Sequence, residues 1–380
     1  MAPFVSHYST VTGGLKAALR PTVRLLREVP VHRERLWQGG RGPMAVFLPA
    51  YGPEGAALLR IYAIAGALRD RGWRTLLLPP RLTLVQRHRL LARATPDIVV
   101  MQGARHGLNR PGYYPGQTIL FDMDDADFHL PHLAGPLRAA MPRVAGVIAG
   151  SRYIADWCLT EGAPRADVLW TGAEVSPGPR PPQAERPPLV AWAQTRPMDY
   201  GAEAALVRGV LARLGARLPG VRFRLYDRRP GDDPAFADTF AAPGVTVEWQ
   251  KNCLYSDYLT ALDDVSIGLA PLCPDENPFA RGKSFGKVLA YLDRGVPVVA
   301  SDAGEHGAFF TERTGVISND PAVWDQGCRD LLLTPALRQG MADRAFQAFR
   351  ARLSLDVITN SFDRICQSYL PSGQSERRQA

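Results

Sequence analysis

The sequence has no long hydrophobic run and only a few cysteines. No stretch of roughly eighteen uncharged apolar residues occurs, so no transmembrane helix is expected. The N-terminus also lacks the charged stretch and apolar core of a secretory signal. The five cysteines are odd in number and form no Cys-x-x-Cys pair, which argues against a disulfide framework and a zinc site. We therefore expect a cytoplasmic protein with reduced thiols at Cys158, Cys253, Cys273, Cys328 and Cys366.

Repeats and nucleic-acid motifs are missing as well. No internal repeat of solenoid period is visible, and no basic motif is interleaved with aromatic residues, so nucleic acid is not an expected partner. What is present is the composition of a soluble globular protein, 46% hydrophobic and 22% charged. A chain of 380 residues is long enough for two domains, each with its own core.

The positive charge is concentrated at the N-terminus. Residues 1–43 hold seven basic and two acidic residues, although the whole chain has a formal charge of only +8. Within residues 14–36, four cations are spaced three or four apart, so a helix would align them with neighbouring leucines. This extension either contacts an anionic membrane face or a lipid-linked substrate, or forms a solvated helix interrupted by Pro21.

Apolar runs alternate with helix-period segments through the rest of the chain. This alternation predicts parallel sheets with right-handed crossovers, covered by helices on both faces. The proline-rich stretch at 176–188 excludes helix and central strand, which predicts a semi-rigid hinge between domains 44–175 and 189–368, with a tail at 369–380. The expected strands are 44–48, 74–78, 97–101, 118–121, 146–149 and 168–170, then 189–193, 222–226, 245–249, 265–269 and 296–300. The expected helices include 56–71, 202–218, 323–333 and 335–353.

The most informative stretch is residues 277–301. A polar loop containing Lys283 leads into a short helix, a turn at Gly295 and a buried strand. A loop that opens into a helix presents unpaired backbone N–H groups, and a neighbouring lysine adds positive charge. This stretch is therefore suited to hold a phosphate.

The order of loop, helix and Gly295-Val-Pro-Val-Val also resembles the donor site of family 4 retaining glycosyltransferases, which share the GT-B fold. The match covers about twenty residues, 282–300, and the domain order extends it over 44–368. The resemblance implies two Rossmann-like domains facing a cleft, with the last helix able to pack back on the first domain. It also implies transfer of a sugar, with retention, from a nucleotide-diphosphate donor to a glycan, lipid-linked or other hydroxyl acceptor. No metal or other cofactor would be required, and the setting would be cell-surface polysaccharide or glycoconjugate synthesis at the inner membrane face.

The same resemblance implies which residues bind the donor. They are Arg196, Asn277, Arg281, Gly282, Lys283, Ser284, Phe285, Gly286 and Lys287. For Arg196 a solvated loop position is the alternative. The family's two glutamates, the second of which holds the ribose, align with Gly282 and Ala290, neither of which is acidic. Ribose binding would then fall to Asp275 or Glu276.

In the first domain, the glycine-rich loop Tyr51-Gly-Pro-Glu-Gly resembles the family's flexible loop at the acceptor side. Gly52, Glu54 and Gly55 are therefore acceptor-binding candidates, although an ordinary strand-to-helix turn would have the same sequence. Arg60, further along, is expected at the surface or in a salt bridge.

Four aspartates follow the strand expected at 118–121: Asp122, Asp124, Asp125 and Asp127. Their mutual repulsion must be compensated. They either cap the next helix and pair with Arg105 and Arg110, or contact the acceptor, or, less favoured, bind a metal. Asp124 and Asp125, with His106 from a neighbouring loop, are the catalytic candidates.

Two other functions fit the same architecture. A nucleotide-sugar epimerase would need acid and base residues that the sequence does not identify. A non-catalytic GT-B homologue that only binds its ligand is favoured by the missing glutamates at Gly282 and Ala290.

Overall fold

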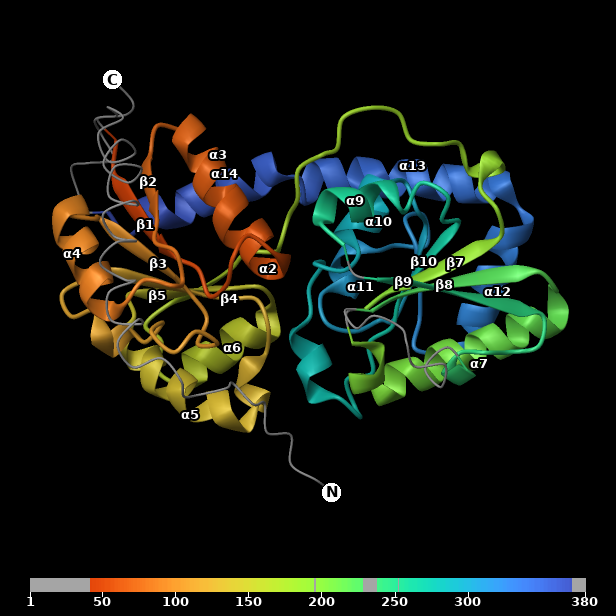
Figure 1. Cartoon of the computed structure of the whole chain (residues 1–380), viewed down its shortest axis with the longest axis horizontal. Helices are drawn as coiled ribbons and strands as arrows, with labels where there is room; N and C mark the ends of the chain where they lie inside the picture. The colour runs from red at the N-terminus through yellow and green to blue at the C-terminus, as the bar shows by residue number, and fades with distance from the viewer. Residues whose placement is uncertain (1–41, 195, 228–237, 252, 371–380) are drawn as a thin grey trace, which may run out of the picture.

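The protein consists of two α/β domains lying side by side (Figure 1). The computed structural model describes residues 42–194, 196–227, 238–251 and 253–370. Each domain is built on a six-stranded parallel sheet flanked by helices, so the predicted architecture of two Rossmann-like domains is confirmed. The basic N-terminal extension, its expected membrane contact at 14–36 and most of the tail lie outside the described residues.

The first sheet has the strand order β2-β1-β3-β4-β5-β6. All the residues of β1, β3, β4 and β5 are buried, as expected of strands covered by helices on both faces. The strand bounds are β1 Met44–Leu48, β2 Arg74–Leu77, β3 Ile98–Gln102, β4 Ile119–Met123, β5 Gly146–Ala149 and β6 Ala166–Val168.

The second sheet has the order β12-β11-β10-β7-β8-β9. Its bounds are β7 Leu189–Ala193, β8 Val221–Asp227, β9 Val245–Lys251, β10 Ile267–Ala270, β11 Val298–Ala300 and β12 Val316–Ile317. In both sheets the first strand lies inside the sheet. The next strands are added on one side of it, and the later strands are added on its other side. The direction changes between β1 and β3 in the first domain and between β7 and β10 in the second. Loops that leave the carboxyl ends of such neighbouring strands open a crevice where α/β folds bind ligands.

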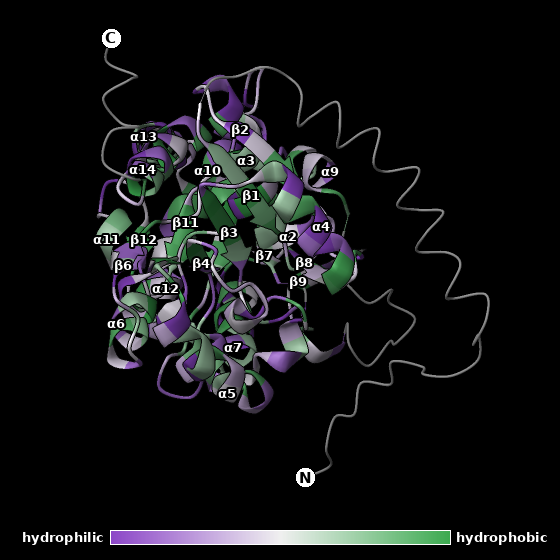
Figure 2. Cartoon of the chain, turned by 90° about the vertical axis from the view of Figure 1, so that its left-hand side faces the viewer, coloured by the Kyte–Doolittle hydropathy of each residue, from purple (hydrophilic) through white to green (hydrophobic). Residues whose placement is uncertain are grey.

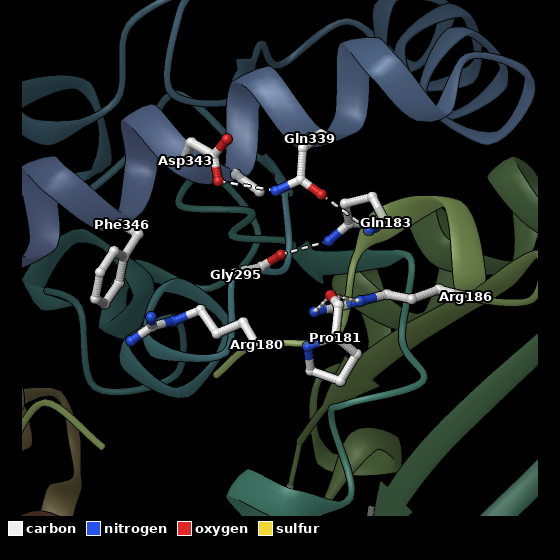
Figure 3. Close-up of a pocket in the computed structure, with 9 residues that line it drawn as sticks. Arg180, Pro181, Gln183, Arg186, Gly295, Gln339, Asp343 and Phe346 are labelled. Atoms are coloured by element: carbon white, nitrogen blue, oxygen red, sulfur yellow. Dashed lines mark hydrogen bonds between the residues drawn. The ribbon is translucent and has the colours of Figure 1, made fainter. Parts of the chain in front are cut away.

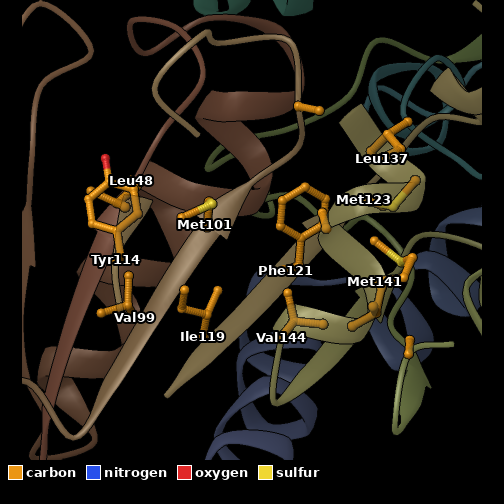
Figure 4. Close-up of a cluster of buried hydrophobic side chains, with 14 of the residues drawn as sticks. Leu48, Val99, Met101, Tyr114, Ile119, Phe121, Met123, Leu137, Met141 and Val144 are labelled. Carbon is orange, nitrogen blue, oxygen red and sulfur yellow. The ribbon is translucent and has the colours of Figure 1, made fainter. Parts of the chain in front are cut away.

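Apolar side chains hold each sheet to its helices. Figure 4 shows Met101 and Phe121 standing on one face of the first sheet, toward Leu137 and Met141 of the helical side. Figure 2 shows that the strands inside the molecule are hydrophobic and that hydrophilic segments of the helices lie on the outside. Burial of such large side chains stabilises a domain by about 1.5–3 kcal/mol each.

The helix expected at 56–71 is divided into three parts. Short α2, Gly55–Ala57, leads into the π-helical turn η1, Leu58–Tyr62, and then into α3, Ala63–Asp70. The wider turn contains Arg60, which is buried, so the expectation of a surface arginine is wrong and that of a salt-bridge residue is correct. The other first-domain helices are α4 Leu84–Ala94, α5 Pro131–Ala140 and α6 Arg152–Thr160. Ser151 caps α6, as its position before the helix predicts.

The second domain contains α7 Gly201–Arg217, α9 Tyr255–Thr260, α10 Leu289–Asp293, α11 His306–Phe309, α12 Pro321–Leu333 and α13 Pro335–Arg352. One further helix, α14 Leu355–Gln367, continues from α13 and lies against the first domain (Figure 1). The signal that could have identified α14 is the helical spacing of its buried residues Leu355, Ile358, Phe362 and Cys366. No described helix is both long and apolar enough to cross a membrane.

The proline-rich segment is tied to the second domain. Gln183 receives a hydrogen bond from Arg338 at its carbonyl and donates its backbone N–H to Gln339. The guanidinium of Arg186 donates to the carbonyl of Val265 over 2.7 Å. Figure 3 shows this segment and α13 around a cavity of about 140 Å³. These hydrogen bonds fix the proline-rich segment to the surface of the second domain.

Candidate functional site

The candidate residues meet where the two domains touch. The turn η3, Asp127–His129, follows β4 in the first domain and contacts η7, Pro278–Gly282, which follows β10 in the second. The approach is close, because a Cβ added at Gly282 would lie only 2.7 Å from the Cβ of Ala126. The aspartate cluster and the phosphate-binding loop predicted from the sequence are therefore neighbours.

A salt bridge joins these two segments. The ammonium of Lys283 donates to Oδ1 of Asp125 over 2.7 Å. Both side chains are about one-fifth exposed, so the pair is at the edge of the boundary and not deep inside it. The ammonium also lies 4.4 Å from the ring centroid of Phe279, which adds a cation–π contact.

Arg105, from the loop after β3, neutralises the other side of the aspartate cluster. Its guanidinium donates to Oδ2 of Asp125 over 2.6 Å and to both oxygens of Asp127. Burial would raise the pKa of Asp125, but the charges of Lys283 and Arg105 outweigh it and hold that pKa below its usual range. Burial raises the pKa of Asp127 despite Arg105. Asp125 is therefore more firmly ionised than Asp127.

A second, fully buried group lies behind Asp125. The guanidinium of Arg60 contacts both oxygens of Asp122 at 2.6–3.1 Å, and these side chains are 1% and 2% exposed. It also donates to Thr171 and to the carbonyl of Leu169. Thr171 in turn donates to Asp124 over 2.7 Å, so the buried Arg60 group also orients the Asp124 carboxylate through Thr171.

These contacts test the structural role predicted for the four aspartates, which combined pairing with Arg105 and Arg110 with capping of the next helix. Pairing with Arg105 is confirmed, but Arg110 instead donates to the carbonyls of its own loop, including Ala104. Capping of the next helix is wrong, because the N-cap of α5 is Leu130, which makes no side-chain cap. Asp122 also belongs to β4 itself and not to the loop after it. Among the described residues, no group of three or more His, Cys, Asp or Glu side chains is arranged to hold a metal ion.

His106 belongs to a neighbouring network. Its Nδ1 accepts a hydrogen bond from the backbone N–H of Leu108 and lies 3.5 Å from a guanidinium nitrogen of Arg87. Burial and then the charge of Arg87 lower the pKa of His106 below its usual value, so the ring is neutral near pH 7. Of the three catalytic candidates, Asp124 and Asp125 therefore lie near Lys283. His106 instead interacts with Leu108 and Arg87.

The glycine-rich loop after β1 is open to solvent. Gly52, Glu54 and Gly55 are exposed, and a Cβ added at either glycine would meet nothing within 4 Å. Gly55 has a φ of +51°, a backbone conformation that favours glycine. The preceding Tyr51 interacts with Arg105, which links this loop to the aspartate cluster. These glycines leave room for a ligand beside the cluster.

The loop that the sequence predicts to bind the donor extends from β10 to the start of α10. The side chain of Asn277 donates to Glu203 over 3.4 Å, and Arg281 is half exposed and lies 3.8 Å from Asp275. The charge of Arg281 contributes, after burial, to lowering the pKa of His129 across the domain boundary.

Residues 284–288 differ in part from the predicted loop that leads directly into a helix. Ser284 is partly buried, the ring of Phe285 is in the core, and Gly286 and Lys287 are exposed. The helix begins only at Leu289, after a turn, so its first N–H groups lie further from Lys283 than the sequence suggested.

Arg196 is exposed and lies 3.7 Å from Asp199, in the loop after β7. Tyr200, at the end of the same loop, interacts electrostatically with Lys283. The two loops at the turning point of the second sheet therefore approach each other. Gly282 and Ala290, which align with the two glutamates of the family that the sequence resembles, are both buried and have no side-chain group that could bind a ribose hydroxyl. Asp275 and Glu276 are exposed at the other end of the loop.

Sequence reasoning missed a carboxylate at the domain boundary. Glu305, before α11, is only 2% exposed and reaches into the first domain. It accepts from the backbone N–H of Arg152 over 2.8 Å, from the Arg152 guanidinium at 2.9 Å and from the indole of Trp170 over 3.0 Å. Its own N–H donates to the carbonyl of Lys283. The sequence shows only that Glu305 is acidic and follows the predicted phosphate-binding stretch 277–301, and it does not indicate contact with the first domain.

No protein-family model matches the sequence, and the comparison with curated proteins gives no match. Solved structures are similar in fold. Sucrose-phosphate synthase from Thermosynechococcus elongatus superposes with a TM-score of 0.64 at 10% identity, covering 86% of this chain and 99% of that one. Anabaena HepE in complex with UDP-glucose gives 0.60 at 14% identity, covering 86% and 99%. A glycosyltransferase from Rickettsia africae gives 0.60 at 12% identity, covering 88% and 100%. These structures and the present one share two Rossmann-like domains, and the chain has the GT-B fold.

Proposed function

We propose that this protein is a glycosyltransferase that moves a sugar from a nucleotide-diphosphate donor to an acceptor hydroxyl, with retention of the anomeric configuration. The acceptor is a glycan, a lipid-linked sugar or another hydroxyl compound of cell-surface polysaccharide or glycoconjugate synthesis. One observation carries the proposal. Lys283 lies at the edge of the domain boundary, on a loop from the sheet's turning point, and faces a carboxylate from the opposite domain.

In this proposal the donor diphosphate binds to Lys283, with Arg281 and Arg196 nearby. Charge that develops on the leaving diphosphate is stabilised by these cations and by backbone N–H groups of the 284–287 turn, without a metal. The acceptor hydroxyl approaches from the first domain, between the Gly52–Gly55 loop and Asp125. HepE, which has the same fold, was solved with UDP-glucose, which supports a nucleotide sugar as the donor class.

The test is a screen of nucleotide sugars by thermal shift, followed by a transfer assay with the donor that binds. A ligand that binds only the folded state stabilises it by about 2.7 kcal/mol at a hundredfold excess over its Kd. Lys283→Ala should abolish both the thermal shift and transfer. Arg89→Ala, which removes an exposed cation on α4, is the charge-matched control and should retain both.

Three further readouts separate the alternatives. The anomeric configuration of the product, measured by NMR, tests retention, and activity in the presence of EDTA tests independence from metal. An epimerase would convert the donor without acceptor, whereas a non-catalytic homologue would bind it and leave it unchanged. If no nucleoside diphosphate binds to the wild-type protein, the proposal is wrong.

A further inference from the structure

Among the described residues, two of the polar contacts that join loops of the second domain to the first differ in accessibility. Glu305 of the second domain binds Arg152 and Trp170 of the first, with its carboxylate 3% exposed. Asp125 of the first domain binds Lys283 of the second, with both side chains about one-fifth exposed. A solute can therefore reach the second contact more easily than the first.

Asp125 occupies the place at Lys283 that an anionic ligand would take. A carboxylate oxygen 2.7 Å from an ammonium nitrogen has the geometry that a phosphate oxygen would adopt with the same lysine. A lysine has a single charged head, so a diphosphate that binds closely must share or displace this carboxylate.

The two oxygens of Asp125 have different partners. Oδ1 accepts from Lys283, while Oδ2 accepts from Arg105 of the same domain over 2.6 Å. Loss of the Lys283 contact would therefore leave Asp125 ionised and still oriented by Arg105. Its freed Oδ1 would face the domain boundary, where it could accept a hydrogen bond from a hydroxyl group.

We propose that Asp125 is a gate at the donor site: the diphosphate of the donor displaces Asp125 from Lys283, and the freed carboxylate then positions the acceptor hydroxyl. This inference rests on the proposed function, because it takes Lys283 as the diphosphate ligand. Donor binding precedes acceptor binding in this scheme. Glu305 keeps the domains together while the Lys283 contact opens, since its carboxylate is buried and has three donors.

The test measures the affinity of two probes, UDP and inorganic pyrophosphate, by titration calorimetry. Pyrophosphate reports on the diphosphate site independently of the nucleotide base. Asp125→Asn should bind both probes about tenfold more tightly than wild type, because Lys283 no longer has a charged competitor. Transfer by this variant should nevertheless fall, because an amide positions the hydroxyl less well than a carboxylate.

Two matched variants exclude simpler causes of tighter binding. Asp124→Asn removes the same charge one residue away, from a carboxylate bonded to Thr171 and not to Lys283. Glu305→Gln weakens the other contact between the domains. Asp124 acts on Lys283 only through space, so Asp124→Asn should raise the affinity clearly less than Asp125→Asn, and Glu305→Gln should leave it unchanged. An equal gain in Asp124→Asn would mean a general charge effect, and an equal gain in Glu305→Gln would mean looser domains; either result overturns the gate.

Lys283→Ala distinguishes failure of the gate from failure of the proposed function. If wild type binds UDP and Lys283→Ala does not, the donor site is correct, and an unchanged affinity in Asp125→Asn refutes only the gate. If wild type and Lys283→Ala bind UDP equally, or neither binds, the donor site itself is wrong.

Discussion

Removal of Arg60 should destabilise the first domain strongly. Arg60 and Asp122 are 1% and 2% exposed and share three close contacts. Arg60→Met would retain most of the side-chain volume but leave the Asp122 carboxylate buried without its cation. Breaking a buried pair in this way costs about 3–5 kcal/mol.

The change should be visible by calorimetry. For a domain of this size each kcal/mol lowers Tm by about 2–4 °C, so Arg60→Met should lower the Tm of the first domain by about 6–20 °C. Burial already raises the pKa of Asp122 even with Arg60 present. Loss of the cation should raise that pKa further, and the variant should recover stability as the pH falls and Asp122 takes up a proton.

The double variant Arg60→Met, Asp122→Leu provides the control. It removes the unpaired charge and should recover about 2 kcal/mol relative to Arg60→Met, since a hydrophobic pair often replaces a buried ion pair at little cost. Recovery should be incomplete, because Thr171 and the carbonyl of Leu169 lose their donor. A Tm loss below about 3 °C in the single variant, or a double variant no more stable than the single one, would refute this reasoning.

Burial lowers the pKa of His306 to about 4 from an ordinary value near 6.5, so its stabilising contribution is present above pH 6.5 and is lost as the pH falls toward 4. The full loss is roughly 3 kcal/mol, and urea unfolding at several pH values should show a flatter profile for His306→Asn. Gly282→Ala places a Cβ 2.7 Å from Ala126 and should cost about 1–3 kcal/mol while increasing the radius of gyration in X-ray scattering. An unchanged radius would show that the side chains adjust locally. Ala290→Glu introduces a carboxylate, the residue type that the resemblance to family 4 would place there, at a site only 1% exposed, so Tm should fall and UDP affinity should not rise.

The sequence predicted the sheets well because parallel strands are apolar runs that need no information from distant residues. The strands at 44–48, 146–149 and 189–193 have the predicted bounds, and the others differ by a few residues. The strand Val316–Ile317 was missed because two residues carry no detectable alternation. The meeting of the aspartate cluster with the Lys283 loop is also consistent with the rule that ligands bind at the carboxyl edges of such sheets.

Pairings between distant residues could not be predicted. Arg60 and Asp122 are separated by 62 residues, and nothing in a regular helical pattern indicates the π-helical turn that contains Arg60. Glu305 bonds to a helix N-terminus 153 residues earlier in the chain. The exact start of α10 at Leu289 depends on the turn before it, which local propensity does not determine.

Helix α14 has a consequence for biosynthesis. It is synthesised after both sheets, yet its Phe362 stacks on Phe47 of β1, and its Asp363 accepts from the indole of Trp73 over 2.7 Å. The first domain therefore leaves the ribosome early but acquires this covering helix only after the second domain has been translated. Until then the nascent chain must expose an apolar face of its first sheet. A premature stop after Arg352 would thus disable the domain made first, although the missing residues follow the second domain in the chain.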